Sequence, residues 1–471
     1  MQELYKYHSV IFVNCIDFSS SLEYTDNRGL GIMERMLMQD LIQWKDKPNK
    51  KPLVVQGVRQ CGKTFLIEDF ARQYYTDVAY YRFDKDAKIK SFFWPDLDPK
   101  RIIKDLGLAR GKTINPQETL IVFDEIQECG NAVTSLKYFC EDAPEYHIIS
   151  AGSLLGVAMK KGTSFPVGKV EFLTLYPMSF YEFFYAQNEM LALELEKSSF
   201  KDSVWANFRN ELLEKYRDFH VIGGMPEVVQ TWLDTKNIEE AEKKQDEILL
   251  GYQKDFVKYA EPKDYPKISA VWQSIPSQLG KENRKFIFSQ VKKGWRAKDL
   301  EDALIWLINA GLVYKVECIE KPNYPISSYA DHTFFKLYMS DIGLLRRHAD
   351  LPVAIVFDDT PAYKEFKGAM AENFVASELK RMYGKLKDKD LYYWMAEGSA
   401  KAEVDFIVQD DEKHIVPIEV KAGTAKHSRS LTQYCKKFAS EKSVLTSLDE
   451  MTSRILPLYA FWKFKEWLKE I

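Results

Sequence analysis

A lysine and a threonine follow a glycine-bounded loop near residue 60, after the apolar stretch 53–55 and before a helical pattern that starts at Lys63. The loop matches the pattern GxxxxGK followed by Ser or Thr without a mismatch. Its residues, all predicted to contact the ligand, are Gly57, Val58, Arg59, Gln60, Cys61, Gly62, Lys63 and Thr64. Backbone N–H groups of such a loop close around phosphate oxygens, which requires glycine where a Cβ would intrude. We therefore predict a site for ATP and Mg²⁺, in which Lys63 neutralises the β- and γ-phosphates and Thr64 holds the metal.

Two acidic residues end a later apolar stretch, 120–123. Asp124 is predicted to bind Mg²⁺ through water at the carboxyl end of a parallel strand, and Glu125 to polarise the attacking water as a general base. Ser153 follows the apolar stretch 147–150 and is a candidate contact to the γ-phosphate, although a plain Gly-Ser turn is an equal alternative. These residues predict ATP hydrolysis, with Lys63 and Glu125 as the catalytic pair.

A second group of acids lies near the end of the chain, on two alternating stretches, 403–408 and 415–420. A hairpin folded about residues 411–412 places Asp405 across from Ile418 or Glu419. Glu419 and Lys421 are two residues apart and share one face of their strand. This D…E-x-K arrangement is typical of restriction-type nucleases, whose acids bind a metal while the lysine positions or activates water. The alternative is the wet face of an antiparallel sheet.

A helix preceding these strands contributes one more candidate to this second site, Glu372.

Strands that alternate with helices between residues 53 and 150 predict a parallel α/β sheet. The sequence pattern is helical between about 200 and 285. A helix at 298–309 followed by a strand at 312–316 fits a winged helix. A helix at 369–383 and the strands after it predict a separate α/β domain. The fold class is therefore α/β with a helical middle region.

Composition limits the classes of function. The 471 residues carry a net charge of -3, with 46% hydrophobic residues and no tract of like charge, which excludes disordered and fibrous proteins. Nucleic-acid binding must then be local, because no whole-molecule basic field exists. Six cysteines without a CxxC spacing indicate reduced thiols, and the chain has no apolar run that could cross a bilayer. We expect a cytoplasmic protein without a membrane partner.

Eight motifs spread along the chain carry a resemblance to a known family. They are GVRQCGKT, LIVFDE, IISAGS, VEFLTLYPMSFYEFF (170–184), GGMPEVV (223–229), FKLYMSDIGLL (335–345), GAMAENFVASEL (368–379) and PIEVKAG (417–423). With them the chain resembles the bacterial and archaeal AAA-type ATPases of unknown biology, which carry a winged-helix region and a restriction-endonuclease-like C-terminal domain. The resemblance implies an AAA-type core whose magnesium-nucleotide site maps on Gly57, Gly62, Lys63, Thr64, Asp124 and Glu125. One departure is Lys169, where similar sequences lead us to expect the arginine of a finger.

Residues and resemblance together predict five regions. They are an N-terminal extension at 1–32 that could be a disordered tail, an AAA-type core at 33–200, a helical lid region at 201–285, a winged-helix-like region at 286–350 and a restriction-endonuclease-like domain at 362–471. Met33 is a plausible start of the folded protein.

Three functions remain open from the sequence. The leading hypothesis is an ATPase whose nucleotide cycle moves the C-terminal domains, with DNA as a candidate partner. The second is a nucleotide-dependent switch or scaffold with an inactive nuclease-like domain, and the third is an ATP-gated, metal-dependent DNA nuclease. Acids at the start of the 298–309 helix would repel DNA, which favours a lid or docking role for this region. A protein partner or a second copy of the chain is therefore the other candidate partner.

Overall fold

Short apolar segments in the first third of the chain form a five-stranded parallel sheet. The computed structural model describes residues 35–153, 166–281, 284–357, 364–384, 390–396, 402–410, 412 and 414–470. The strands lie in the order β2-β3-β4-β1-β5. Their bounds are β1 Leu53–Gln56, β2 Asp77–Arg82, β3 Thr119–Asp124, β4 His147–Gly152 and β5 Glu171–Thr174. The extension predicted at residues 1–32 lies outside the described residues.

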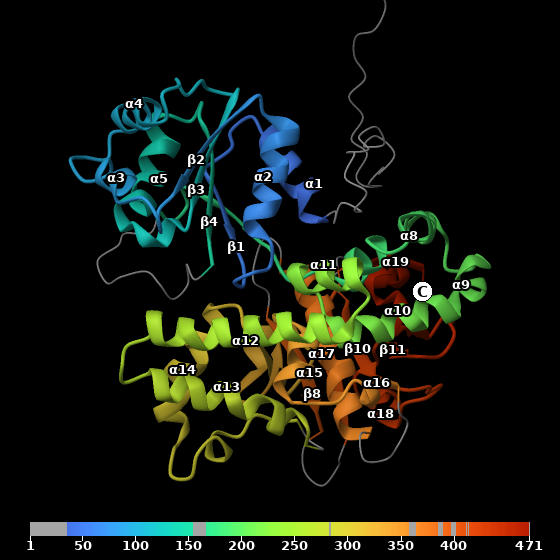
Figure 1. Ribbon diagram of the computed structural model, residues 1–471. Coiled ribbons are helices and arrows are strands. Elements are labelled where there is room, and N and C mark those ends of the chain that lie inside the picture. The colour runs from blue at the N-terminus through green and yellow to red at the C-terminus, as the bar shows by residue number, and fades with distance from the viewer. Residues whose placement is uncertain are drawn as a thin grey trace, which may run out of the picture. The chain divides into compact units, whose positions relative to one another are not determined.

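Helices cover both faces of this sheet (Figure 1). Their bounds are α1 Leu37–Asp46, α2 Lys63–Tyr74, α3 Ala87–Ser91, α4 Pro99–Arg110 and α5 Gly130–Asp142. Alternate residues of β3 enter different cores: Val122 belongs to the core that contains Phe70 of α2, and Phe123 to the core that contains Leu136 of α5. A strand buried on both faces reads as a continuous apolar run, which is why 120–123 lacks polar residues. The predicted parallel α/β core is confirmed.

A helical region follows this sheet. Its main helices are α7 Phe180–Tyr185, α8 Glu189–Lys197, α9 Val204–Asn207, α10 Arg209–Ile222, α11 Pro226–Thr235, α12 Ile238–Tyr259, α13 Tyr265–Leu279 and α14 Ala297–Asn309. The longest, α12, has 22 residues and buries a stripe that includes Ala241, Ile248, Tyr252 and Phe256. This spacing of three and four residues is the helical period. One face of α12 therefore packs into the core along its whole length.

A seven-stranded mixed sheet forms the rest of the chain, in the order β12-β11-β10-β9-β8-β6-β7. The strands are β6 Val313–Ile319, β7 Ala330–Met339, β8 Leu391–Met395, β9 Glu403–Gln409, β10 Ile415–Val420, β11 Val444–Ser447 and β12 Ile455–Pro457. The helices of this part are α15 Ile342–His348, α16 Ala354–Phe357, α17 Lys364–Tyr383, α18 Arg429–Phe438 and α19 Phe464–Glu470. Helix α17 is buried over most of its length, since 12 of its 20 residues are buried.

This sheet joins two regions that the sequence predicts as separate. Strand β6 pairs in parallel with β8, with Val316 opposite Leu391, so residues 313–339 and 391–457 share one hydrogen-bonded sheet. The order of α14, β6 and β7 expected of a winged helix is present, but its two strands are the end of the larger sheet. The α/β domain predicted from residue 362 therefore has no sheet of its own, because its strands continue the sheet of β6 and β7. The physical reason is that the free edge of β6 offers unpaired backbone groups, and β8 pairs with them.

Sequence patterns missed the strands β5, β7, β11 and β12. The longest of them, β7, has the polar stretch Asp331-His332-Thr333 near its start, which does not alternate.

Among the described residues, every helix is too short or too polar to cross a membrane.

Candidate functional site

The predicted phosphate loop connects β1 to α2 and is held by close backbone packing. Gly57 has φ 150°, and a Cβ there would lie 2.1 Å from the carbonyl oxygen of Leu175. Gly62 is the N-cap of α2 and has φ 93°, in the left-handed region that glycine adopts without strain. Both glycines are therefore required by the path of the chain itself. These two positions are the local reason for the conformation of the loop.

Lys63 lies inside this loop. Its side chain is 7% exposed, and its Nζ donates hydrogen bonds of 2.9 Å to the carbonyl oxygens of Gly57 and Val58. No side chain caps the N-terminus of α2 at Gly62. An uncapped helix start directs free N–H groups and the positive end of the helix dipole outward. The loop therefore combines a buried ammonium with an open helix N-terminus, which is the arrangement that binds phosphate.

Arg35, which the sequence analysis missed, hydrogen-bonds the backbone of the loop. Arg35 donates through Nη1 to the carbonyl oxygen of Cys61 at 2.8 Å, and through Nε to Glu182 at 3.0 Å. Its Nη2 reaches the carbonyl oxygen of Tyr176 at 2.7 Å. The ion pair is buried on both sides, with side chains 5% and 6% exposed. Because Arg35 and Glu182 lie 147 positions apart, no local pattern could have revealed the contact.

The two predicted acids lie where β3 ends, at the carboxyl edge that also carries the loop. Asp124 is 5% exposed, and its Oδ2 accepts a hydrogen bond of 2.6 Å from the hydroxyl of Tyr80 on the neighbouring strand β2. Burial, together with Asp124, raises the pKa of Tyr80 above its ordinary value, so the phenol stays a hydrogen-bond donor. Tyr80 is a second residue of this site that the sequence analysis missed.

Glu125 and Ser153 lie together at this edge. Ser153 Oγ donates to Glu125 Oε1 at 3.3 Å, and Gln127 Nε2 donates to Glu125 Oε2. Glu125 itself has φ 51°, a left-handed conformation that is uncommon outside glycine and frequent at functional turns. The structure thus brings Ser153 next to Glu125, as expected for residues at the ends of the adjacent strands β3 and β4. Lys169, the departure from the expected arginine, is exposed and pairs with Glu141 at 2.8 Å.

Helix α12 contacts this edge at two points. Arg59 of the loop forms an ion pair with Asp255, and Tyr252 donates its hydroxyl to the carbonyl oxygen of Arg59 at 3.2 Å. One turn further on, the hydroxyl of Tyr259 donates to Glu128 at 3.1 Å, just after the Asp124 and Glu125 pair. The carboxyl-terminal end of α12 therefore touches both the phosphate loop and the segment behind the two acids.

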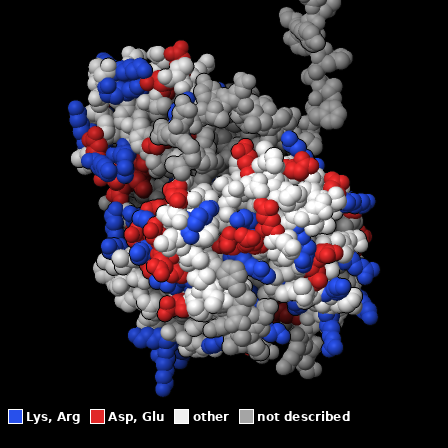
Figure 2. All heavy atoms as spheres, turned by 45° about the vertical axis from the view of Figure 1, so that its right-hand side comes forward, with Lys and Arg blue, Asp and Glu red and all other residues white. Residues whose placement is uncertain are grey.

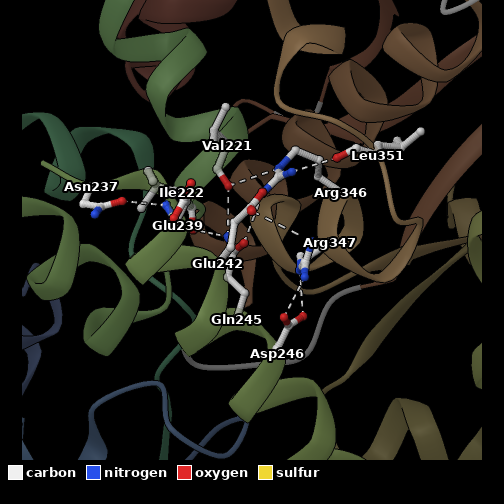
Figure 3. Close-up of polar contacts among 10 residues, drawn as sticks. All are labelled: Val221, Ile222, Asn237, Glu239, Glu242, Gln245, Asp246, Arg346, Arg347 and Leu351. Carbon is white, nitrogen blue, oxygen red and sulfur yellow. Dashed lines mark hydrogen bonds and ion pairs between the residues drawn. The ribbon is translucent and has the colours of Figure 1, made fainter.

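The amino-terminal half of α12 is clamped to α15 (Figure 3). Arg346 is fully buried and donates to Glu242 at 2.8 Å and to Gln245 at 3.2 Å. Arg347 pairs with Asp246 through two bonds of 2.7 and 2.6 Å. Since α15 follows directly on β7, α12 links the loop to the seven-stranded sheet through continuous contacts.

A pocket of about 240 Å³ opens beside the loop. It is lined by Gly57, Val58 and Ser153 together with residues 308–311 of the turn between α14 and β6. In this turn a Cβ on Gly311 would lie 3.6 Å from the backbone N of Val58. The second sheet therefore approaches the loop through this turn as well as through α12.

The predicted second acidic site contains a lysine that the sequence analysis missed. Lys336 of β7 is buried, and its Nζ lies 3.3 Å from Glu372, 2.6 Å from Glu403 and 3.7 Å from Asp405. Arg284 forms a further ion pair with Glu372. Burial alone would lower the pKa of Lys336, but Tyr338, Glu403 and Asp405 outweigh it and raise this pKa above its ordinary value. The lysine stays charged, so these acids already have cations of the protein, Lys336 and Arg284, as partners.

The register of the hairpin agrees with one of the two predicted alternatives. Strand β9 pairs with β10 so that Phe406 faces Ile418, which puts Asp405 next to Glu419, and Asp405 Oδ2 accepts from the backbone N of Val420 at 2.8 Å. Lys421 binds Glu419 at 2.6 Å. Burial and the Asp405 carboxylate raise the pKa of Glu419 to about 7, against the pull of Lys421. The predicted residues Glu372, Asp405, Glu419 and Lys421 are thus brought into one region, but as an ion-pair cluster.

Within the described residues, three side chains able to bind a metal converge only at Asp410, Glu412 and His414, in the turn between β9 and β10. Lys442 lies 3.4 Å from Glu412 and 3.8 Å from Asp410 in this turn. The four residues predicted as a nuclease site are not such a group.

A phosphate-type loop, a parallel sheet and paired acids at its carboxyl edge together define a P-loop nucleotide-binding domain. Residues 49–184 match the family model described as AAA domain, so this domain is of the AAA ATPase type. Residues 213–353 and 367–460 match two further models, described as Domain of unknown function (DUF8612) and Domain of unknown function (DUF4143). No curated protein matches the chain.

Several solved structures resemble the chain at low identity. A Walker-type ATPase of Pyrococcus abyssi is 13% identical over 69% of this chain and 99% of its own, with a TM-score of 0.41. The Orc1 protein of Aeropyrum pernix in complex with DNA is 11% identical over 68% and 92%, with a TM-score of 0.27. Cdc6p of Pyrobaculum aerophilum is 12% identical over 70% and 97%, with a TM-score of 0.24. At such scores the assignment rests on the loop and on the AAA domain match alone.

Proposed function

We propose that the chain binds ATP with Mg²⁺ at the loop between β1 and α2 and hydrolyses it. One observation carries the proposal: the ammonium of Lys63, the open N-terminus of α2 and the carboxylates of Asp124 and Glu125 lie at one edge of one parallel sheet. The lysine and the N–H groups suit the phosphates of a nucleotide, and the two acids suit the divalent ion that the phosphates carry. An isolated anion site would not need the acids.

The residues present fit both ligands. In the proposed site, Lys63 and the N–H groups at the start of α2 hold the phosphates, and Thr64 and Asp124 hold the metal. Glu125 accepts a hydrogen bond from Ser153, and this contact orients its carboxylate for polarising the attacking water. Magnesium supplies charge neutralisation at the phosphates.

We further propose that the nucleotide state reaches the seven-stranded sheet through α12. Arg59 and the carbonyl at the same residue both contact this helix, and at its other end Arg346 and Arg347 bind it to α15. A phosphate that draws Arg59 toward itself would break its pair with Asp255. This contact supplies the two-state element that an ATP-driven movement or a switch needs.

For the second acidic region the ion pairs favour a scaffold without nuclease activity. Lys336 forms ion pairs with Glu372, Glu403 and Asp405, two of which belong to the predicted nuclease site. Removing a buried cation from three acids is strongly unfavourable, so a metal would have to displace a partner that is already in place. The ATP-gated nuclease is therefore the less favoured alternative.

DNA, a protein partner and a second copy of the chain remain the proposed partners. On the described residues of the face drawn in Figure 2, positive and negative side chains are interspersed. With a net charge of -3, DNA contact would then be confined to a local surface. Hydrolysis measured with and without double-stranded DNA tests this contact.

Calorimetry with ATP and Mg²⁺, together with steady-state hydrolysis with and without double-stranded DNA, tests the proposal. The wild-type chain is expected to bind and hydrolyse ATP, and Lys63→Ala to lose both. Lys51→Ala is the matched control, because Lys51 also donates to a carbonyl oxygen, that of Gly168, but lies outside the loop. Absence of nucleotide affinity in the wild type contradicts the proposal. Binding without turnover supports the switch, and stimulation by DNA supports DNA as the partner.

A further inference from the structure

Tyr80 lies beside the two side chains that the proposed function assigns to the metal. It belongs to β2, which pairs in parallel with β3 so that Arg82 stands opposite Asp124. The Tyr80 hydroxyl donates to Asp124 Oδ2 at 2.6 Å, while Asp124 Oδ1 accepts from the backbone N of Glu125 at 3.1 Å. Both carboxylate oxygens of a nearly buried aspartate are thus held, which leaves the side chain a single orientation.

Thr64, at the start of α2, is near enough to the same hydroxyl to lower the pKa of Tyr80, against burial and Asp124, which raise it. Thr64 and Asp124 lie on different elements, a helix and a strand, with no covalent reason to keep a fixed spacing. The phenol that holds Asp124 therefore lies beside the second proposed metal ligand. A group of this kind acts on a metal through its ligands, by fixing their orientation.

We propose that Tyr80 is a positioning residue for Mg²⁺, holding the Asp124 carboxylate in the orientation that receives the ion. The inference rests on the proposed function, because it concerns the same nucleotide site. It names a residue that neither the loop pattern nor the acid pair contains. Mg²⁺ demands near-ideal octahedral geometry, so a loosened aspartate costs more for this ion than for the nucleotide itself.

The neighbouring residue supplies a matched control. Tyr81 lies on the opposite face of β2, is 5% exposed and donates its hydroxyl to the carbonyl oxygen of Leu106 at 3.0 Å. Tyr81→Phe removes one buried hydroxyl from the same strand without touching Asp124 or Thr64. It therefore reports the general cost of such a change.

The experiment is a calorimetric titration of the full chain with ADP, first in EDTA and then over a series of Mg²⁺ concentrations. Tyr80→Phe is expected to raise the half-saturating Mg²⁺ concentration by about 10- to 100-fold while leaving the affinity in EDTA unchanged. Tyr80→Leu, which removes the same hydroxyl with a different side-chain shape, is expected to show the same shift. Tyr81→Phe should keep the wild-type dependence on Mg²⁺.

Two results would overturn the inference. One is a wild-type dependence on Mg²⁺ in both Tyr80 variants, and the other is an equal loss of ADP affinity with and without Mg²⁺, which indicates a purely structural role. Failure of the proposed function looks different, because the wild-type chain itself would then bind no nucleotide in either buffer.

Discussion

Two groups of acids, one in each sheet, have different surroundings. Asp124 and Glu125 end β3 beside an uncapped helix start, and their hydrogen-bond partners are Tyr80, Gln127 and Ser153. Asp405 and Glu403 lie on β9 and face Lys336, which reaches both. The first group has hydrogen-bond donors without charge as its partners, whereas the second is paired with a buried cation.

The difference shows that grouped carboxylates do not by themselves define a metal site. Sequence patterns predicted Asp124 and Glu125 in the first group and Asp405 in the second, both in patterns associated with metal chemistry, but not Glu403. What separates them is the position of the nearest cation: Lys63 lies across the sheet edge in the loop, while Lys336 lies within the acid cluster. The predictions below are arranged to test this separation, from the largest effect to the smallest.

Glu125→Gln should remove the general base while keeping the shape of the site. We expect ATP turnover to fall by about 10²- to 10⁴-fold with ATP affinity retained. Glu118→Gln, an exposed residue just before the same strand, is the control and should keep wild-type turnover. Unchanged hydrolysis in Glu125→Gln would remove the catalytic role from this carboxylate.

Lys336→Met should remove the buried cation that pairs with the buried carboxylates of Glu372 and Asp405 and with Glu403. We expect the free energy of unfolding, measured in urea by tryptophan fluorescence, to fall by about 3–5 kcal/mol. Lys298→Met, at an exposed position, should change it little. Stabilisation of the Lys63→Ala chain by Mn²⁺ or Mg²⁺, lost when Lys63→Ala is combined with Asp405→Asn, would show instead that the cluster is a metal site.

The two regions should also differ in the sign of their pH dependence. Burial, with Lys50 and Lys45, lowers the pKa of His147 from 6.5 to about 4, so its contribution to stability is lost as pH falls through this window. Glu419 has a pKa raised from 4.5 to about 7, so its contribution is present below pH 4.5 and lost as pH rises toward 7. Unfolding free energies measured from pH 4 to 8 should show both slopes, each at most about 1.4 kcal/mol per pH unit.

Two variants separate these slopes. His147→Asn should flatten the rise with pH, and Glu419→Gln should flatten the decline. Identical curves for wild type and both variants would mean that neither group titrates differently in the folded and unfolded chain.

The smallest expected effect concerns the contact between the loop and α12. A double-mutant cycle on Arg59→Ala and Asp255→Asn should give a coupling energy of about 0.5–1 kcal/mol, because the Arg59 side chain is half exposed. If a phosphate draws Arg59 away, this coupling should shrink in saturating ATP with Mg²⁺. The same coupling with and without nucleotide would argue against transmission through α12.

Much of the architecture could be predicted from local patterns. The helical stretch at about 200–285 and the strand at 415–420 were predictable: α12 carries a helical period of buried residues, and 415–420 is a short apolar run. β7 could not be predicted, since its first half is polar and its pairing partner β6 lies across an intervening turn. The pairing of β6 with β8 could not be predicted either, because the tertiary structure decides which strands become neighbours.

Eight consecutive residues determine the phosphate loop, because its glycines, its lysine and its threonine are close in sequence and their contacts are local. Sequence therefore identified Gly57, Gly62, Lys63 and Thr64 together with the two acids that end the third strand. Tertiary structure alone decided which groups stand next to them. Tyr80 meets Asp124 across 44 positions and Lys336 meets Glu372 across 36, since such contacts depend on strand register and helix packing rather than on neighbouring residues.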